Sequence, residues 1–278
     1  MASESILNPY YQLKFVSHDF WELYGDPRVS KYFLFSSGPW ITLTAIGIYL
    51  SFVKIIGPQM MRDRKPLELR RLMVLYNIAM VLLSFYIFAK GCSLLNFGLD
   101  TWGCRLVRGQ PVYDNFSHQF LDLAWLFFFS KLIEFADTVF FVLRKKSSQI
   151  TSLHVIHHSV VPISVWMGFK FAPDGNNAFF PLLNSGIHTL MYSYYGLTAA
   201  GNALGIQEHL ARVKKYLTAA QICQFLLAIV HGFSSFFSED CANAPKASYI
   251  INLLNASMFL VLFCSFYRRA YTKPHKQS

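Results

Sequence analysis

Charged residues are scarce in this chain, and most of them are basic. Lys, Arg, Asp and Glu make up 14% of its 278 residues, with 25 basic and 15 acidic side chains. Disordered proteins are rich in charge and poor in apolar residues, whereas 54% of this sequence is hydrophobic. A nucleic-acid-binding protein gathers basic residues on a water-facing domain, and no polar stretch here is long enough to form one. The composition therefore excludes disorder and predicts no nucleic-acid partner.

Cysteine is also rare. The five cysteines form no CxxC pair and no other metal-ligand spacing, which argues against a disulfide scaffold and a zinc site. The first thirty-one residues lack the short apolar core and cleavage site of a removable signal peptide, so we expect the first apolar run to serve as the anchor.

Long apolar runs separated by clusters of charge indicate a membrane protein, because a helix needs about 20 residues to cross a bilayer. We predict an all-α, multi-pass membrane protein with seven transmembrane helices, forming one integral-membrane domain over residues 1–278. The expected spans are roughly 34–56, 70–91, 120–143, 150–171, 177–201, 214–238 and 247–268. The third expected span carries several charged residues, so its polar face must point into protein or water.

The loops between these spans predict the orientation in the membrane. Lys and Arg are concentrated in the segments 62–71, 144–146, 212–215 and 268–276, which alternate onto one side. That side should be cytosolic, with the carboxyl end on it and the amino end lumenal. Cys104 and Cys241 then fall in two lumenal loops, where thiols oxidise, and we predict a disulfide between them.

Three histidines of the fourth expected span share one helical stripe. His154, His157 and His158 occur at i, i+3 and i+4. Polar groups are costly inside a membrane, so this cluster favours a function, with an interhelical polar clasp as the structural alternative. In the fifth span, His188 also favours function, and Asn184, Tyr192 and Tyr195 on the same face are candidate substrate-binding residues or interhelical hydrogen-bonding groups.

Two further spans carry polar groups. In the third, Lys131, Glu134 and Asp137 either serve the reaction or neutralise one another as a buried network. In the sixth, Gln221 and Gln224 provide a neutral hydrogen-bonding face, while His231 is expected to be structural. From a helical rise of about 1.5 Å per residue, we expect these groups to converge on a pocket entered from the cytosol. Basic residues at its expected mouth, suited to phosphate groups, are Arg144, Lys145, Lys214 and Arg268.

With these residues identified, the sequence resembles the very-long-chain fatty acid elongase (ELO) family. KLIEFADT matches the family's K-x-x-E-x-x-D-T, HVIHH its histidine box, HTLMYSYY its H-x-x-M-Y-x-Y-Y, and TAAQICQ its T-x-x-Q-x-x-Q, in the family order. The resemblance implies a seven-span protein of the endoplasmic reticulum membrane in which six helices enclose an acyl tunnel. It implies condensation of a long-chain acyl-CoA with malonyl-CoA to 3-ketoacyl-CoA, carbon dioxide and CoA.

The resemblance also implies partners, namely ketoacyl-CoA reductase, dehydratase and enoyl-CoA reductase, and it leaves a homodimer open. Because no cysteine lies in the polar cluster, an imidazole is the available nucleophile. We expect His157 to carry the acyl group, with His154 and His158 beside it and His188 assisting condensation. His158 as nucleophile, and direct deprotonation in a ternary complex, remain alternatives. No metal or other cofactor is expected.

Two other classes compete with this interpretation. The HxxHH pattern also occurs in membrane di-iron desaturases and hydroxylases, but these resemble eight-histidine sites, and the expected helices supply only five histidines. A seven-span transporter or receptor would also explain buried histidines and carboxylates. Against it stand the density of the imidazole cluster and the lack of broken helices or inverted repeats of the transporter kind.

Overall fold

The computed structural model describes residues 8–103, 111–201, 205, 207–241 and 246–272, and all regular structure in these ranges is helical. The α-helices are α2 (Pro9–Lys14), α3 (Phe20–Tyr24), α4 (Trp40–Ser51), α5 (Gly57–Met61), α6 (Arg70–Leu94), α7 (Pro111–Ile133), α8 (Phe135–Leu143), α9 (Ser152–Phe171), α10 (Phe179–Ala200), α11 (Gln207–Phe237) and α12 (Lys246–Tyr267). The π-helical segment η1 (Phe15–Asp19) joins α2 to α3, η2 (Phe52–Ile56) joins α4 to α5, and η7 (Arg268–Thr272) continues α12. The short 3₁₀ turns are η3 (Asn96–Thr101), η4 (Ser147–Gln149) and η6 (Glu239–Cys241).

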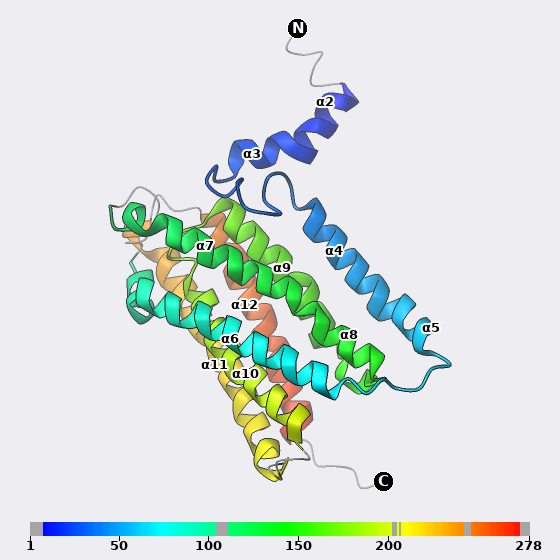
Figure 1. The fold of residues 1–278 in the computed structure, drawn as a ribbon. Coiled ribbons are helices and arrows are strands. Elements are labelled where there is room, and N and C mark those ends of the chain that lie inside the picture. The colour runs from blue at the N-terminus through cyan, green and yellow to red at the C-terminus, as the bar shows by residue number, and fades with distance from the viewer. Residues whose placement is uncertain (1–7, 104–110, 202–204, 206, 242–245, 273–278) are drawn as a thin grey trace.

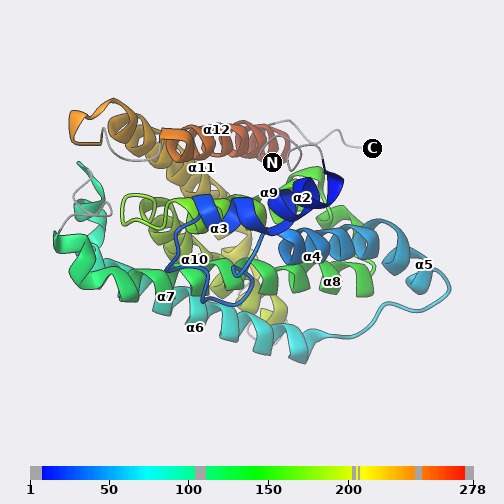
Figure 2. The ribbon, with the colours of Figure 1, turned by 90° about the horizontal axis from the view of Figure 1, so that it is seen from above.

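Six long helices pack as a closed ring. Helix α6 contacts α7, α7 contacts α9, α9 contacts α12, α12 contacts α11, α11 contacts α10, and α10 returns to α6. Helix α4 stands outside this ring, against α9 (Figure 1). Viewed from above, α11 and α12 lie on one side of the ring and α6 and α7 on the opposite side (Figure 2). The interior of the ring is therefore reached by residues from six different helices.

The outward faces of the helices are apolar. Leu75 and Leu82 of α6, and Leu254 and Val261 of α12, each expose about two thirds of their surface. Four of the described helical stretches are long and apolar enough to cross a membrane: Trp40–Met61, Arg70–Leu94, Glu208–Phe237 and Lys246–Thr272. Exposed apolar surface of this extent is stable when it faces lipid. The helices α7 with α8, α9 and α10 carry the polar residues discussed below, and that all seven segments cross stays a prediction.

The helices differ in their bounds from three of the expected spans, and the spans themselves stay predictions. Residues 34–39 are not helical, because Leu34 has a left-handed backbone (φ 75°) and Pro39 precedes the first turn of α4. The third segment begins earlier, at Pro111, and is interrupted at Glu134. The sixth begins at Gln207, several residues before the expected position 214.

Two local features shape the helices that carry the histidines. At Glu134, the amide of Asp137 donates to the Glu134 carbonyl (3.1 Å), an i to i−3 bond that tightens the chain between α7 and α8. Helix α9 begins after Thr151, whose Oγ1 accepts the amide of His154 (3.2 Å) as an N-cap. Pro162 lies inside α9, four residues after His158.

The segment before α4 is also ordered, which the sequence did not predict. Helices α2 and α3 lie at the end of the bundle where the described chain begins (Figure 1). Lys170, fully buried near the end of α9, holds this segment through Glu22 Oε1 (3.0 Å) and the Phe35 carbonyl (2.9 Å). Lys170 is thus a structural contact between α9 and the segment before α4.

Candidate functional site

The break at Glu134 places an ion pair inside the ring. Lys131 Nζ lies 2.7 Å from Glu134 Oε1, and both side chains are almost fully buried. Lys131 also donates to Asn184 Oδ1 of α10 (3.0 Å). Glu134 Oε1 lies 3.0 Å from His188 Nδ1. Of the three charged residues considered as a self-neutralising network, Lys131 and Glu134 therefore form an ion pair, and this pair contacts a predicted catalytic histidine.

The same contacts orient His188. Glu134 is an acceptor, so the 3.0 Å contact places the proton on His188 Nδ1. Lys131 Nζ is farther from that nitrogen, at 3.4 Å. A proton held on Nδ1 leaves Nε2 as the nitrogen with a free lone pair. His188 is thus arranged to accept or deliver a proton through Nε2.

The residues after the break tie other helices to the site. Asp137 Oδ2 accepts the Tyr192 hydroxyl of α10 (2.8 Å). Thr138 Oγ1 lies 2.7 Å from His154 Nε2 on one side and 3.1 Å from the Tyr49 hydroxyl of α4 on the other. Sequence reasoning missed Tyr49, whose only signal is a phenol amid an otherwise apolar run. The block 131–138 therefore connects α4, α9 and α10 around the histidines.

All four predicted catalytic histidines come together. One ring nitrogen of His157, one of His188 and a carboxylate oxygen of Glu134 lie within 4.8 Å of one another. The His158 ring is 4.3 Å from that of His154 and 5.4 Å from that of His157, measured between centroids. His157 Nδ1 is buried and has no hydrogen-bond partner. The histidine cluster thus includes a buried His157 ring nitrogen that makes no hydrogen bond.

Other predicted site residues lie at the edge of this cluster or away from it. Tyr195 packs on Tyr192 and is partly exposed. Gln221 Nε2 contacts Met191 Sδ (3.8 Å), and Gln224 Oε1 is buried without a partner. Among the basic residues expected at the mouth, Arg144 is half-buried, whereas Lys145, Lys214 and Arg268 are exposed.

Only one of the two cysteines in the predicted disulfide lies among the described residues. Cys241 is disulfide-bonded, and Cys92, Cys223 and Cys264 are free. Cys104 lies outside the described residues, so the pairing stays a prediction.

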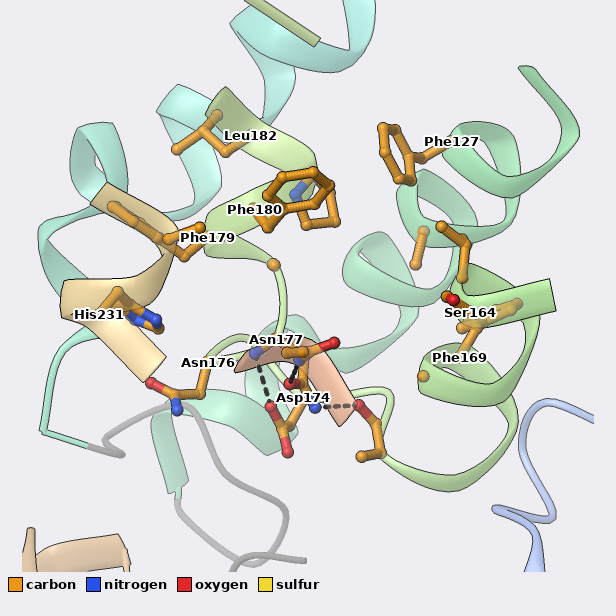
Figure 3. A pocket seen from close by; sticks show the side chains of 18 of the residues that line it. Phe127, Ser164, Phe169, Asp174, Asn176, Asn177, Phe179, Phe180, Leu182 and His231 are labelled. Atoms are coloured by element: carbon orange, nitrogen blue, oxygen red, sulfur yellow. Dashed lines mark hydrogen bonds between the residues drawn. The ribbon is translucent and has the colours of Figure 1, made fainter. Parts of the chain in front are cut away.

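A cavity of about 160 Å³ lies inside the ring, and Figure 3 shows part of its lining, including Phe127, Ser164 and Asp174. The His157 ring packs against Phe259, with centroids 5.1 Å apart, and Phe259 lines the cavity. Helix α9 contributes Val161, Ser164 and Gly168, which continue the stripe of His157 along one face. Phenylalanines from α7, α9, α10, α11 and α12 complete a mostly apolar wall. The histidine cluster therefore stands at one end of a long apolar space.

The segment 172–178 between α9 and α10, here named the cavity floor, lies at the other end of the cavity. Asn177 donates to the Ala172 carbonyl (2.8 Å) and accepts from Ser248 (3.1 Å) and Asn252 (2.9 Å). Asp174 Oδ1 accepts the Asn177 amide (2.9 Å), and burial raises the pKa of the Asp174 carboxyl to about 7. Sequence reasoning missed the cavity floor, because the sequence of residues 172–178 indicates only an ordinary loop.

Asn176 ties the floor to α11 and α12. Its Nδ2 donates to Ser235 Oγ and to the Tyr249 hydroxyl, each at 3.0 Å. The Ser235 hydroxyl donates to the His231 carbonyl (3.0 Å), so it must accept from Asn176, which fixes the amide's orientation. Asn176 Oδ1 is left without a partner. His231 itself contacts the Thr101 carbonyl through Nε2 (3.0 Å), in agreement with the structural role expected for it.

Glu134, His157 and His188 also form a set of three groups that could ligate a metal ion. The Lys131 ammonium lies 2.7 Å from the Glu134 oxygen and would repel a cation there. The set does not fit a di-iron centre, which would need more carboxylate and histidine ligands than these three groups supply.

The sequence is similar to a known protein family over most of its length. The sequence profile of the GNS1/SUR4 (ELO) family matches residues 34–278. The chain is 43% identical over 253 residues to very long chain fatty acid elongase 7 of Drosophila melanogaster, covering 89% of this chain and 73% of the relative. It is 42% identical to elongase 7 of Rattus norvegicus (93% and 90% covered) and 38% identical to elongase 1 of Homo sapiens (90% and 88%). The protein that arranges four histidines above an apolar cavity therefore belongs to the ELO family of very long chain fatty acid elongases.

Proposed function

We propose that this protein condenses a long-chain acyl-CoA with malonyl-CoA, forming 3-ketoacyl-CoA, carbon dioxide and CoA. The observation that carries this proposal is the meeting of His157, His188 and Glu134 at the head of an apolar cavity. A thioester carbonyl at the histidines would place its acyl chain along α9, among the phenylalanines. Family membership favours this condensing reaction over the desaturase and transporter alternatives.

His157 is the proposed nucleophile. Its unprotonated ring nitrogen attacks the acyl-CoA carbonyl, the carbon–sulfur bond breaks, and the CoA thiolate leaves with the proton that the imidazole loses. The contacts favour His157 over its neighbours, because His154 Nε2 is engaged by Thr138 and His157 packs on a cavity residue. The product of this half-reaction is an acyl-imidazole and free CoA.

His188 is proposed to serve the second half-reaction. Malonyl-CoA loses carbon dioxide, the resulting enolate carbon attacks the acyl-imidazole carbonyl, and the bond from the carbonyl carbon to the imidazole nitrogen breaks. The departing imidazolate takes up a proton from solvent, which restores neutral His157 and leaves 3-ketoacyl-CoA. The protonated His188 Nδ1 is held by Glu134, so Nε2 can orient malonyl-CoA and stabilise developing charge when it carries a proton. Lys131 keeps Glu134 ionised and in place.

The cellular setting follows from the same proposal. The protein would span the endoplasmic reticulum membrane seven times, with a lumenal amino end and a cytosolic carboxyl end. Acyl-CoA and malonyl-CoA would enter from the cytosol, near Arg144, Lys145, Lys214 and Arg268. The 3-ketoacyl-CoA product requires reduction, dehydration and a second reduction, so the matching partners are a ketoacyl-CoA reductase, a dehydratase and an enoyl-CoA reductase.

The test is single-turnover chemistry with the purified protein. Acyl-CoA alone should release about one equivalent of CoA per enzyme, and addition of malonyl-CoA should yield the 3-ketoacyl product. His157→Ala should abolish CoA release, whereas His188→Ala should impair condensation more than loading. Stoichiometric CoA release by His157→Ala, together with a covalent acyl adduct in its mass spectrum, would show that the nucleophile is another residue.

A further inference from the structure

Three glycines line the cavity, and they differ in what surrounds them. A Cβ atom added at Gly91 of α6 would lie 2.9 Å from Leu182, and one added at Gly232 of α11 would lie 2.9 Å from Leu253. These two glycines permit close helix packing. A Cβ added at Gly168 of α9 would meet nothing within 4 Å. Gly168 therefore faces open space rather than a neighbouring helix.

Neither packing nor backbone conformation requires glycine at this position. Gly168 lies within α9 and is not among the glycines with positive φ in the described chain. Glycine inside a helix is less stable than alanine by about 1 kcal/mol. The feature that distinguishes position 168 is its place on the stripe of Val161 and Ser164, which faces the cavity. The missing side chain leaves that part of the cavity unfilled.

The depth of Gly168 relates this space to the acyl chain. Gly168 follows His157 by eleven residues, which corresponds to about 16 Å along a helix axis. The cavity floor begins four residues later, at Ala172, about 6 Å farther on. A side chain at position 168 would therefore separate the last few methylene groups of a long chain from the deepest part of the cavity.

We propose that Gly168 is a specificity-determining position, whose missing side chain keeps the deep end of the cavity open to the longest acyl chains. This inference rests on the proposed condensing function. Larger residues at position 168 shorten the longest chain that fits, by about one or two two-carbon steps for a blocked depth of about 6 Å. Chains that end above Gly168 are unaffected.

The experiment compares Gly168→Ala, Gly168→Leu and Gly168→Phe in the full-length protein, with kcat/KM measured for a series of saturated acyl-CoAs and malonyl-CoA. For Gly168→Leu, the ratio of kcat/KM for the longest accepted chain to that for a short one should fall about tenfold, with a larger fall for Gly168→Phe. Gly168→Ala should change the ratio least and should not lower thermal stability, because alanine favours the helix.

Gly47→Leu is the matched control. Gly47 lies on α4, outside the ring, and a Cβ there also meets nothing within 4 Å. This variant should leave the chain-length ratio unchanged. An unchanged ratio in folded Gly168→Leu, or an equal loss for all chain lengths, would overturn the inference. If Gly168→Phe does not fold, the Ala and Leu variants decide the outcome. Absence of condensation by the unaltered protein would instead refute the proposed function.

Discussion

The two ends of the cavity both bury polar side chains, but the chemistry of the two sets differs. At the histidine end, Lys131, Glu134 and the imidazoles are groups that exchange protons or carry charge. At the floor, the hydrogen bonds are mostly between neutral amides and hydroxyls. Among the described buried side-chain atoms without a partner, His157 Nδ1 lies at the histidine end and Asn176 Oδ1 lies at the floor. An imidazole nitrogen can attack a thioester or bind a proton, whereas an amide oxygen can do neither. The unpartnered nitrogen of His157 therefore has a chemistry that the unpartnered oxygen of Asn176 lacks.

The largest expected effect comes from breaking the ion pair. Glu134→Gln leaves Lys131 buried without its counter-charge, so we expect a loss of about 3–5 kcal/mol in stability and more than about a hundredfold in kcat/KM. Activity with acyl-CoA and malonyl-CoA, and thermal unfolding in detergent, measure these changes. Glu208→Gln, at an exposed position of α11, is the control and should change neither.

Removing both charges sharpens this test. The double variant Lys131→Met, Glu134→Leu should recover most of the stability lost in Glu134→Gln, because no unpaired charge remains. It should stay inactive, since His188 loses the acceptor for its Nδ1 proton. Recovery of activity with stability would mean that the pair only supports the fold.

Much of the histidine end could be predicted from the sequence, because its residues repeat at helical spacing inside apolar runs. His154, His157 and His158 are polar residues in a segment that should be apolar. Because buried polar groups are energetically costly in a membrane, their presence indicated a functional site. The pairing of Lys131 with Glu134 follows from their i, i+3 spacing. Tyr49 could not be assigned, because a single tyrosine in an apolar helix carries no periodic signal, and its contact with Thr138 depends on how α4 packs.

The floor could not be predicted for a different reason. Asn177 bonds to Ser248 and Asn252, more than seventy residues away in sequence. Local sequence there indicates only a turn. The interruption at Glu134 was also missed, because its residues all have ordinary helix propensity and the irregularity comes from tertiary contacts with α10.

A smaller effect is expected from Thr138→Val, which removes the hydroxyl between His154 and Tyr49. We expect about a tenfold fall in kcat/KM and about 1 kcal/mol of lost stability. Thr42→Val is a matched control in α4, because the Thr42 hydroxyl is buried and has no partner. That control should be neutral or slightly stabilising. Equal effects of the two substitutions would argue against a role for Thr138 in positioning His154.

At the floor, Asn177→Ala should affect stability more than chemistry. It removes one donated and two accepted hydrogen bonds of the side chain, so we expect about 2 kcal/mol of lost stability. Turnover of a short acyl-CoA, whose chain does not reach the floor, should remain within about twofold. A loss of short-chain activity as large as that of Thr138→Val would contradict the prediction that the floor affects stability more than chemistry.

The last prediction concerns the pH dependence of stability at Asp174. Its folded pKa of about 7 lies above the ordinary value, so the folded protein holds a proton that the unfolded chain releases above about pH 4. Stability should therefore fall as pH rises from about 4 to 7, by at most about 4 kcal/mol from this group. Asp174→Asn should flatten that part of the profile of unfolding temperature against pH. A slope identical to that of the unaltered protein would contradict the assignment.

Pro162 adds a property to the histidine end that no side chain there supplies. Proline has no amide hydrogen, so the carbonyl of His158, four residues earlier, loses its helical donor. A backbone oxygen without a donor is costly in a membrane interior, and a water molecule or a substrate N–H or O–H group would relieve that cost. The helix that carries the proposed nucleophile thus also presents a backbone carbonyl that lacks its helical donor. Near the His158 carbonyl, the backbone of α9 therefore favours a group that can donate a hydrogen bond over one that can only accept.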